Sequence, residues 1–331
     1  MIGVVSLDEL ADGSPDAIAA LRDALHGDGV VALDAAGRFG GGSTTELFEQ
    51  ARRFFLLPLA ERRAVGLSSS TNLRGFVGVG QETTNGVVDL KESFEFAREL
   101  SPPAGDPSPW HRLYGSNLWP DTDVLPGFRS VLRRFVDDIG AIGDSVVRSL
   151  VSSLGQPLGP GAPSGFFDRE SCVFSRLIRY GDPGDHRDDA TRLDAHTDHG
   201  LVTLTLEDSP GLEVQRRDGG WEIAEGVPLV FAGELLEFWS LGYFRACPHR
   251  VMSGALIRER LSIATFIEPD LGAVVAPVRR SSFDSSEAPG VPVGNFWLPD
   301  DQVPGDDPPP VAVGDAEWRR MASIFGDEVA S

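Results

Sequence analysis

Apolar residues recur along this chain with two different spacings. In the first half they follow the period of an α-helix, which predicts helices over residues 15–26 and about 128–154. Ser14 is a typical residue before a helix, and Gly27 is a typical residue after one. A short apolar strand is expected at 30–33, so the first part of the chain mixes helices with short strands.

The glycine-rich stretch at 40–43 leads into a further expected helix. No Lys follows these glycines, so the stretch does not match a phosphate-binding loop. The apolar residues after it share one helical face, and they are Leu47, Ala51, Phe54 and Phe55. A last amphipathic helix is expected over about 316–325.

From residue 172 onward the pattern changes to short runs of apolar and β-branched residues. These runs lie at 172–180, 201–206, 212–215, 227–231, 249–253 and 261–267. Many short strands at this spacing predict a double-sheet barrel or a jelly roll. The expected fold class is therefore α+β, with a double-stranded β-helix (jelly-roll) core, an N-terminal helical lobe and a C-terminal helix.

The same pattern predicts three parts. They are a mostly helical lobe with short strands at 1–155, the jelly-roll core at 165–275, and a C-terminal loop and helix at 276–331 that pack on the core. No repeat and no long linker separates them, so we expect one packed unit.

Composition excludes several classes of function. The chain has 331 residues, with 50 acidic against 29 basic side chains and a formal net charge of −21, which argues against nucleic-acid binding. No apolar run reaches the ~18 residues of a membrane span, and the N-terminus lacks the basic residues of a secretory signal. We therefore expect a cytoplasmic protein. Two cysteines cannot form a disulfide framework or a four-thiolate zinc site.

The candidate chemistry centres on three residues. His196 and Asp198 are two apart, so on a strand their side chains would point to one face while His199 points away. His249 comes from another predicted strand. Two imidazoles and one carboxylate form the metal-binding triad of non-haem Fe(II) oxygenases. A core histidine and a turn aspartate would produce the same short pattern, so His196 and Asp198 alone do not establish a metal site.

Arg260 and Ser262 are also two apart, on the strand that follows His249. A guanidinium and a hydroxyl on one face suit the binding of a carboxylate. The alternative for Arg260 is an ion pair between strands.

Taken together, these residues resemble the catalytic core of the isopenicillin N synthase-like family of 2-oxoglutarate-dependent Fe(II) oxygenases. The core resemblance rests on His196-Thr197-Asp198-His199-Gly200, Pro210-Gly211-Leu212, Trp221, Gly233-Glu234, His249-Arg250-Val251, Arg260-Leu261-Ser262 and Phe266. The N-terminal part is also similar to that family's helical lobe, on Phe54-Phe55, Pro58, Arg74-Gly75-Phe76 and Asp89-Leu90-Lys91-Glu92.

The resemblance implies a role for each matching residue. His196, Asp198 and His249 would bind Fe(II), and Arg260 and Ser262 would hold the distal carboxylate of 2-oxoglutarate. The remaining candidates are Tyr180, at a position that often touches this carboxylate, and three residues placed near the substrate, namely Phe266, Arg74 and Phe94. The sequence departs from the family beside Tyr180, where Gly181 replaces the usual proline, and at Leu241, where an asparagine is usual.

The implied activity is that of a non-haem Fe(II)/2-oxoglutarate-dependent dioxygenase that consumes O2 and acts on a small molecule. An Fe(IV)-oxo unit would hydroxylate the substrate, or desaturate or cyclise it. Asp198 argues against halogenation, because halogenating relatives have a small residue there. Lys91 is the only lysine, which indicates a high-GC coding sequence, and with this family it suggests bacterial secondary metabolism such as antibiotic biosynthesis. The oligomeric state stays open.

Three alternatives remain at this point. One is an Fe(II) oxidase of the isopenicillin N synthase type, in which Arg260 would bind the substrate instead of 2-oxoglutarate. The second is a non-catalytic binding protein on the same barrel. A zinc hydrolase is the third, although no general-base glutamate stands at motif spacing.

Overall fold

The computed structural model describes residues 2–35, 44–105, 108–162, 164–181, 191–224, 228–252, 259–278, 288–298 and 308–325. The predicted loop at 40–43 and His186 lie outside these ranges. In sequence order the strands are β1 (Val4–Ser6), β2 (Val30–Asp34), β3 (Gly75–Val77), β4 (Thr83–Thr84), β5 (Val87–Val88), β6 (Glu92–Ala97), β7 (Cys172–Tyr180), β8 (Thr191–His196), β9 (Val202–Glu207), β10 (Leu212–Gln215), β11 (Trp221–Ile223), β12 (Leu229–Ala232), β13 (His249–Met252), β14 (Arg260–Glu268), β15 (Val274–Val275) and β16 (Val311–Ala312).

The described helices pack around and against this framework. They are α1 (Leu7–Ala11), α2 (Pro15–Gly27), α3 (Thr44–Phe55), α4 (Leu59–Ala64), α5 (Phe128–Ser153), α6 (Glu234–Trp239) and α7 (Val313–Phe325), with 3-10 turns η1 (Leu67–Ser69) and η2 (Pro109–Leu113). None of these helices is both long and apolar enough to cross a membrane.

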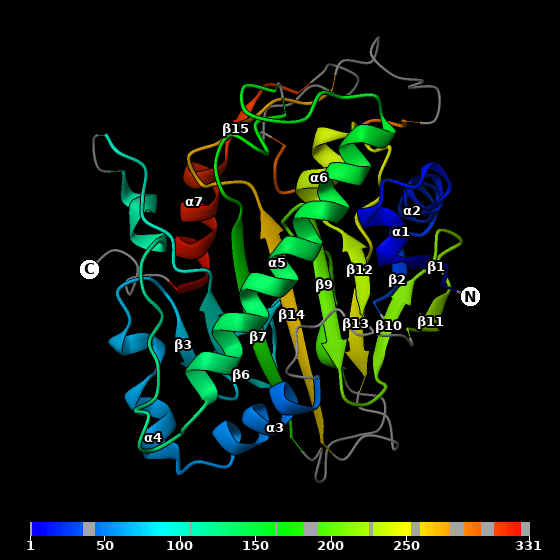
Figure 1. Cartoon of the computed structure of the whole chain (residues 1–331). Coiled ribbons are helices and arrows are strands. Elements are labelled where there is room, and N and C mark those ends of the chain that lie inside the picture. Colours follow the sequence, from blue (N-terminus) through cyan, green and yellow to red (C-terminus); the bar gives the residue numbers. More distant parts are fainter. Residues whose placement is uncertain are drawn as a thin grey trace.

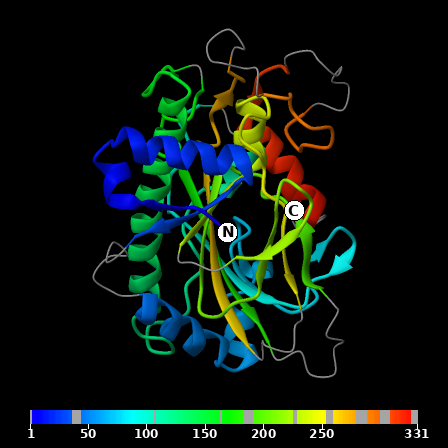
Figure 2. The ribbon, with the colours of Figure 1, turned by 90° about the vertical axis from the view of Figure 1, so that its right-hand side faces the viewer.

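Two sheets make the core of the molecule. Within the described ranges, eight strands form a large sheet in the order β1-β2-β12-β9-β14-β7-β6-β3, and four strands form a smaller sheet in the order β11-β10-β13-β8 (Figure 1). In Figure 2 the helices α2 and α5 lie on the outer side of the large sheet, and β10 lies on the opposite side. The jelly-roll core predicted from the sequence is confirmed.

The predicted strands agree closely with the observed ones. β7 and β10 have the predicted bounds, and β14 is one residue longer at each end. Strand β8 was not among the predicted runs, because its sequence Thr-Arg-Leu-Asp-Ala-His lacks a continuous apolar stretch. It forms part of the wall of a polar site, which explains the unusual composition.

Helix α5 packs along the large sheet and buries the predicted apolar stripe. Val146 and Leu150 have no exposed surface, and Leu132 has none either. Gly143 permits the close approach, since a Cβ there would lie 2.4 Å from Cγ1 of Ile267 on β14. A larger residue at this position would push the helix off the sheet.

The N-terminal residues contribute to the large sheet at both of its edges. β1 and β2 pair beside β12 at one edge, and β6 and β3 pair beside β7 at the other. The division of the chain at residue 155 stays a prediction. Helix α7 begins at Val313, three residues before the predicted start, and its second residue, Gly314, lies against the ring of Trp110.

Candidate active site

Three predicted metal ligands meet in the space between the two sheets. His249 opens β13 and pairs directly with His196, the last residue of β8. Asp198 follows the end of β8 and lies in the turn after it. The expectation that strand alternation aligns Asp198 with His196 is therefore wrong, because the turn brings the carboxylate back toward the two imidazoles.

The start of α6 holds this turn in place. The backbone N–H of Glu234 donates to the carbonyl oxygen of Asp198 over 2.7 Å. The Thr197 hydroxyl donates to the Glu234 carboxylate. Gly233 is required here, since a Cβ would lie 2.2 Å from the carbonyl oxygen of Gly200. The family motif Gly233-Glu234 thus acts through backbone contact with the turn that carries Asp198.

The side chains of the triad point toward one another. One ligand atom from each residue lies within 4.8 Å of the others. Nε2 of His196 is 3.8 Å from Oδ1 of Asp198, and Nε2 of His249 is 3.7 Å from Oδ2. These separations leave room for an ion that all three could bind.

Backbone carbonyls orient both imidazoles. Nδ1 of His196 lies 2.8 Å from the carbonyl oxygen of Asp194, and Nδ1 of His249 lies 3.0 Å from that of Cys247. A carbonyl only accepts hydrogen bonds, so Nδ1 carries the hydrogen and the lone pair stays on Nε2. Both rings therefore present a lone pair to the centre of the triad, as metal-binding histidines do.

The electrostatics also fit a cation. Burial, helped by His249, lowers the pKa of His196 to about 4, so the ring is neutral at pH 7. Burial raises the pKa of Asp198, but His249 and His196 outweigh it, and the carboxyl stays ionised. Its Oδ2 atom is buried without a hydrogen-bond partner within the described part of the chain. A buried, ionised oxygen beside two lone pairs fits a divalent metal.

The predicted carboxylate-binding residues lie at one end of the same cavity. Arg260 pairs across the sheet with Tyr180, and its guanidinium carbon lies 5.3 Å from the centre of that ring. Ser262 follows on the same face of β14, and all three residues line the cavity. Burial raises the pKa of Tyr180, and the positive charge of Arg260 offsets part of that rise, so the phenol stays protonated.

Arg260 makes an ion pair that sequence analysis offered as the alternative to ligand binding. Its Nη2 donates to the carboxylate of Glu207 on β9, and its Nε donates to the carbonyl oxygen of Ser209 over 3.1 Å. Among the described residues, Nη1 of Arg260, the hydroxyl of Ser262 and the hydroxyl of Tyr180 make no hydrogen bond. Glu207 thus fixes the guanidinium and leaves donors facing the cavity.

The three residues predicted near the substrate have different positions. Phe266 lines the cavity, with its ring centre 6.1 Å from that of Phe174. Arg74 also lines it, but its amino groups donate to the carbonyl oxygens of Leu113 and Gly115, so it anchors that segment. Its substrate role stays a prediction.

Phe94 is not a cavity residue. Its side chain has no exposed surface and packs against Phe54 and Phe128, with ring centres 4.8 Å and 5.2 Å away. On β6, Phe94 points to the side of the sheet that the helices cover and away from the metal triad. This position corrects the prediction that Phe94 lies near the substrate. The sequence does not show which face of such a short strand is the inner one.

His199 stays outside the triad, in agreement with the expectation that its side chain does not join those of His196 and Asp198. It lines the cavity, and its ring meets Phe296 edge-on with centres 4.8 Å apart. Burial, helped by the charge of Arg320, lowers the pKa of His199 to about 3. It is not part of the triad and forms the neighbouring wall.

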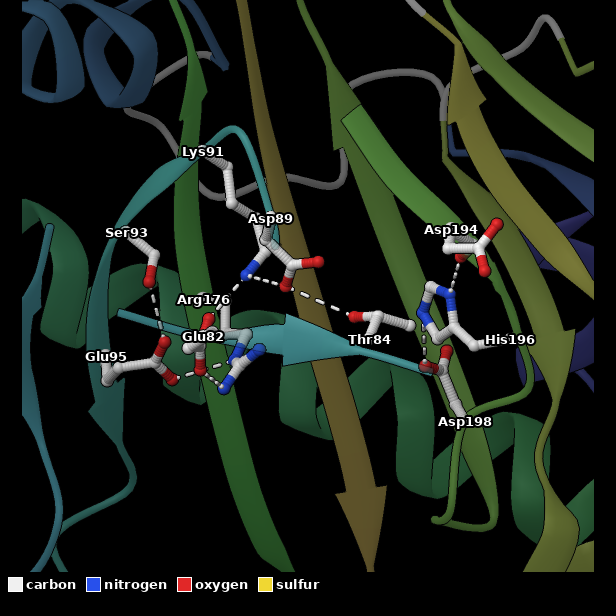
Figure 3. Close-up of polar contacts among 10 residues, drawn as sticks. All are labelled: Glu82, Thr84, Asp89, Lys91, Ser93, Glu95, Arg176, Asp194, His196 and Asp198. Atoms are coloured by element: carbon white, nitrogen blue, oxygen red, sulfur yellow. Dashed lines mark hydrogen bonds and ion pairs between the residues drawn. The ribbon is translucent and has the colours of Figure 1, made fainter. Parts of the chain in front are cut away.

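A network of charged residues, missed by sequence analysis, lies beside the triad (Figure 3). Lys91 pairs with Glu82 and, over 3.0 Å, with Asp89. The Thr84 hydroxyl donates to Asp89 over 3.2 Å, and in Figure 3 Thr84 lies between Asp89 and His196. The hairpin formed by β4 and β5 is thereby held against the metal site.

Comparison with known proteins gives two matches to families and many to individual relatives. Residues 2–122 match the family described as non-haem dioxygenase in morphine synthesis N-terminal, and residues 172–269 match the 2OG-Fe(II) oxygenase superfamily. A homoarginine-6-hydroxylase of Oryza sativa subsp. japonica is 31% identical over 253 residues, covering 72% of this chain and 75% of that protein. The chain belongs to the 2-oxoglutarate- and Fe(II)-dependent oxygenases.

Other relatives support the same family. Clavatol oxidase of Penicillium crustosum is 30% identical over 266 residues, covering 73% of this chain and 76% of that protein. Among solved structures, a full-length Neurospora crassa protein in complex with alpha-KG has a TM-score of 0.75 and 22% identity, covering 97% of this chain and 96% of that one. At 22% identity, this structural similarity shows a shared fold alone.

The protein is thus a non-haem Fe(II)/2-oxoglutarate-dependent dioxygenase, an oxidoreductase that requires Fe(II), 2-oxoglutarate and O2. Relatives named as 2-oxoglutarate-dependent enzymes favour this activity over an oxidase that dispenses with 2-oxoglutarate and over a non-catalytic barrel. His196, Asp198 and His249 are the group of three that fits the metal among the described residues.

Proposed function

We propose that His196, Asp198 and His249 bind Fe(II), and that Arg260, Ser262 and Tyr180 hold the distal carboxylate of 2-oxoglutarate. The observation that carries the proposal is the buried, unpartnered oxygen of Asp198 between two imidazoles whose lone pairs face it. When bound, the iron and its co-substrate supply the oxidising power to remove hydrogen from an unactivated C–H bond.

The residues of this chain then have three tasks. His196, Asp198 and His249 would hold the metal through three protein ligands, which leaves open positions for co-substrate and O2. Arg260, fixed by Glu207, gives the carboxylate of 2-oxoglutarate a charged partner at the far end of the site. The cavity of about 770 Å³ is large enough for a small molecule beside the co-substrate.

We infer hydroxylation, desaturation or cyclisation of a small molecule as the reaction. The relatives' names include a homoarginine-6-hydroxylase, kihadalactone A synthase and clavatol oxidase, so the same framework serves different substrates. A role in bacterial secondary metabolism, including antibiotic biosynthesis, stays a prediction from the sequence.

Anaerobic visible spectroscopy tests the site assignment. Adding Fe(II) and then 2-oxoglutarate should produce a weak charge-transfer band, and His196→Ala should abolish it by removing a ligand. Arg260→Ala should weaken 2-oxoglutarate binding about 100-fold, since a charge-assisted hydrogen bond is lost. Ser262→Ala, which leaves the Arg260–Glu207 pair intact, should weaken it about fivefold.

Arg134→Ala is the control, because Arg134 pairs with Glu46 at the surface. It should bind 2-oxoglutarate as the wild type does. Unchanged affinity in both Arg260→Ala and Ser262→Ala would show that the carboxylate lies elsewhere, and a band in His196→Ala would overturn the metal assignment.

A further inference from the structure

The cavity has a second charged region, where the end of β14 meets α7. Glu268 is the last residue of β14, and Glu317 and Arg320 come from α7; all three line the cavity. Glu268 lies against Gly200, where a Cβ would be 3.2 Å from Cγ of Glu268 and 3.5 Å from its Oε1. Gly200 belongs to the turn that carries Asp198, so this region borders the metal site.

Among the described residues, the two carboxyl groups of this region share one neighbouring cation, Arg320. Nε and Nη2 of Arg320 both donate to Oε2 of Glu317, over 2.9 Å and 2.6 Å. The other oxygen, Oε1, is buried without a hydrogen-bond partner among the described residues, and Glu317 is only 2% exposed. Glu268 makes no hydrogen bond or ion pair within the same part of the chain. The two hydrogen bonds that Arg320 donates here thus reach Oε2 of Glu317, and they reach neither Oε1 of Glu317 nor Glu268.

An unpartnered buried carboxylate is costly unless a ligand supplies its partner. Burial and repulsion from Glu317 raise the pKa of Glu268 to about 8, and Arg320 offsets only part of this effect. A neutral or anionic ligand would leave these oxygens without a charged partner. A cation would pair with the free oxygen of Glu317 and favour the ionised form of Glu268, so that both carboxyl groups gain a charged partner.

We propose that Glu268 and Glu317 bind a cationic group of the substrate, an ammonium or a guanidinium. This inference rests on the proposed oxygenase function and names the class of substrate. Phe266 lies two residues before Glu268 on the same face of β14, between that residue and Ser262. An apolar part of the substrate would lie along Phe266. The C–H bonds of that part would then lie beside the triad, while the cationic group of the substrate stays with Glu268 and Glu317.

Paired probes that differ in charge test the proposal. We would titrate anaerobic protein, loaded with Fe(II) and 2-oxoglutarate, with L-arginine and L-citrulline and with hexylamine and 1-hexanol, using calorimetry. In at least one pair the cation should bind about tenfold more tightly than its neutral partner. Glu268→Gln should abolish this preference without loss of a structural partner. Glu46→Gln, at the surface, should retain it.

The outcomes separate this proposal from the oxygenase function. If neither cation binds more tightly than its neutral partner, or if Glu268→Gln keeps the preference, the cation site is wrong. Glu317→Gln should also reduce the preference, and circular dichroism checks that it folds. The charge-transfer band with 2-oxoglutarate should persist in Glu268→Gln. Its absence from the wild type would instead overturn the proposed function.

Discussion

Individual carboxylates in the cavity owe their behaviour to the partners that surround them. Asp198 stays ionised because two imidazoles offset its burial, whereas burial and a neighbouring carboxylate together raise the pKa of Glu268 to about 8. Glu82 shows the opposite case, since Arg176 and Lys91 overcome its burial and lower its pKa to about 2. The sequence names these residues without revealing which of them lack a partner.

The raised pKa of Glu268 predicts a pH dependence of stability. Between about pH 4.5 and 8 the folded protein keeps a proton on Glu268 that the unfolded chain has released, so this residue destabilises the fold increasingly as pH rises. Glu268→Gln should therefore gain ~1–3 kcal/mol in free energy of unfolding at about pH 8.5 relative to wild type, and little at about pH 4.5. Urea denaturation at both pH values measures it, and an equal change at both would contradict the assignment.

Among the elements, the hairpin β4–β5 is held to the rest of the site by side chains. Asn85, at its tip, donates to the carbonyl oxygen of Ala195 on β8 over 2.8 Å. At its base, Lys91 binds Glu82 and Asp89 (Figure 3). The sequence does not reveal this attachment, because 83–88 is too short and polar for a periodic pattern, whereas long elements such as α5 and β7 were predicted within a residue.

Lys91→Met should weaken this attachment. The change leaves Glu82 and Asp89 as buried carboxylates that have lost an ion-pair partner, and such a loss costs about 3–5 kcal/mol. Arg216→Met removes a cation from an exposed pair with Glu222 and should cost far less stability than Lys91→Met. Chemical denaturation of both variants gives the comparison, and similar losses would show that the buried network does not stabilise the fold.

At the scale of the whole molecule, the site exists only because the two sheets face each other. His196 and His249 come from the small sheet, whereas Arg260 and Ser262 come from the large one. The C-terminal helix α7 adds Glu317 to the same cavity. Iron and 2-oxoglutarate would therefore connect elements that are distant in the sequence.

Binding across the sheets predicts a joint thermal stabilisation. Fe(II) with 2-oxoglutarate, at about 100 times the dissociation constant, should add ~2.7 kcal/mol and raise Tm by about 5 °C, measured anaerobically. 2-Oxoglutarate without metal should raise it much less, because its keto-acid end then has no partner. His196→Ala should show no joint effect, and an equal rise in that variant would mean that the ligands bind outside the triad.

The sequence by itself determined the jelly-roll class, the strands β7, β10 and β14, and the residues of the triad. These features depend on local periodicity, on the short spacing of His196 and Asp198 and, for His249, on the resemblance to the family. The tertiary structure decided that Asp198 reaches the triad through a turn, that Phe94 belongs to the core, and that Glu207 fixes Arg260. It also brought Glu268 and Glu317 together, because long-range packing, and not the order of residues, sets which charges share a buried space.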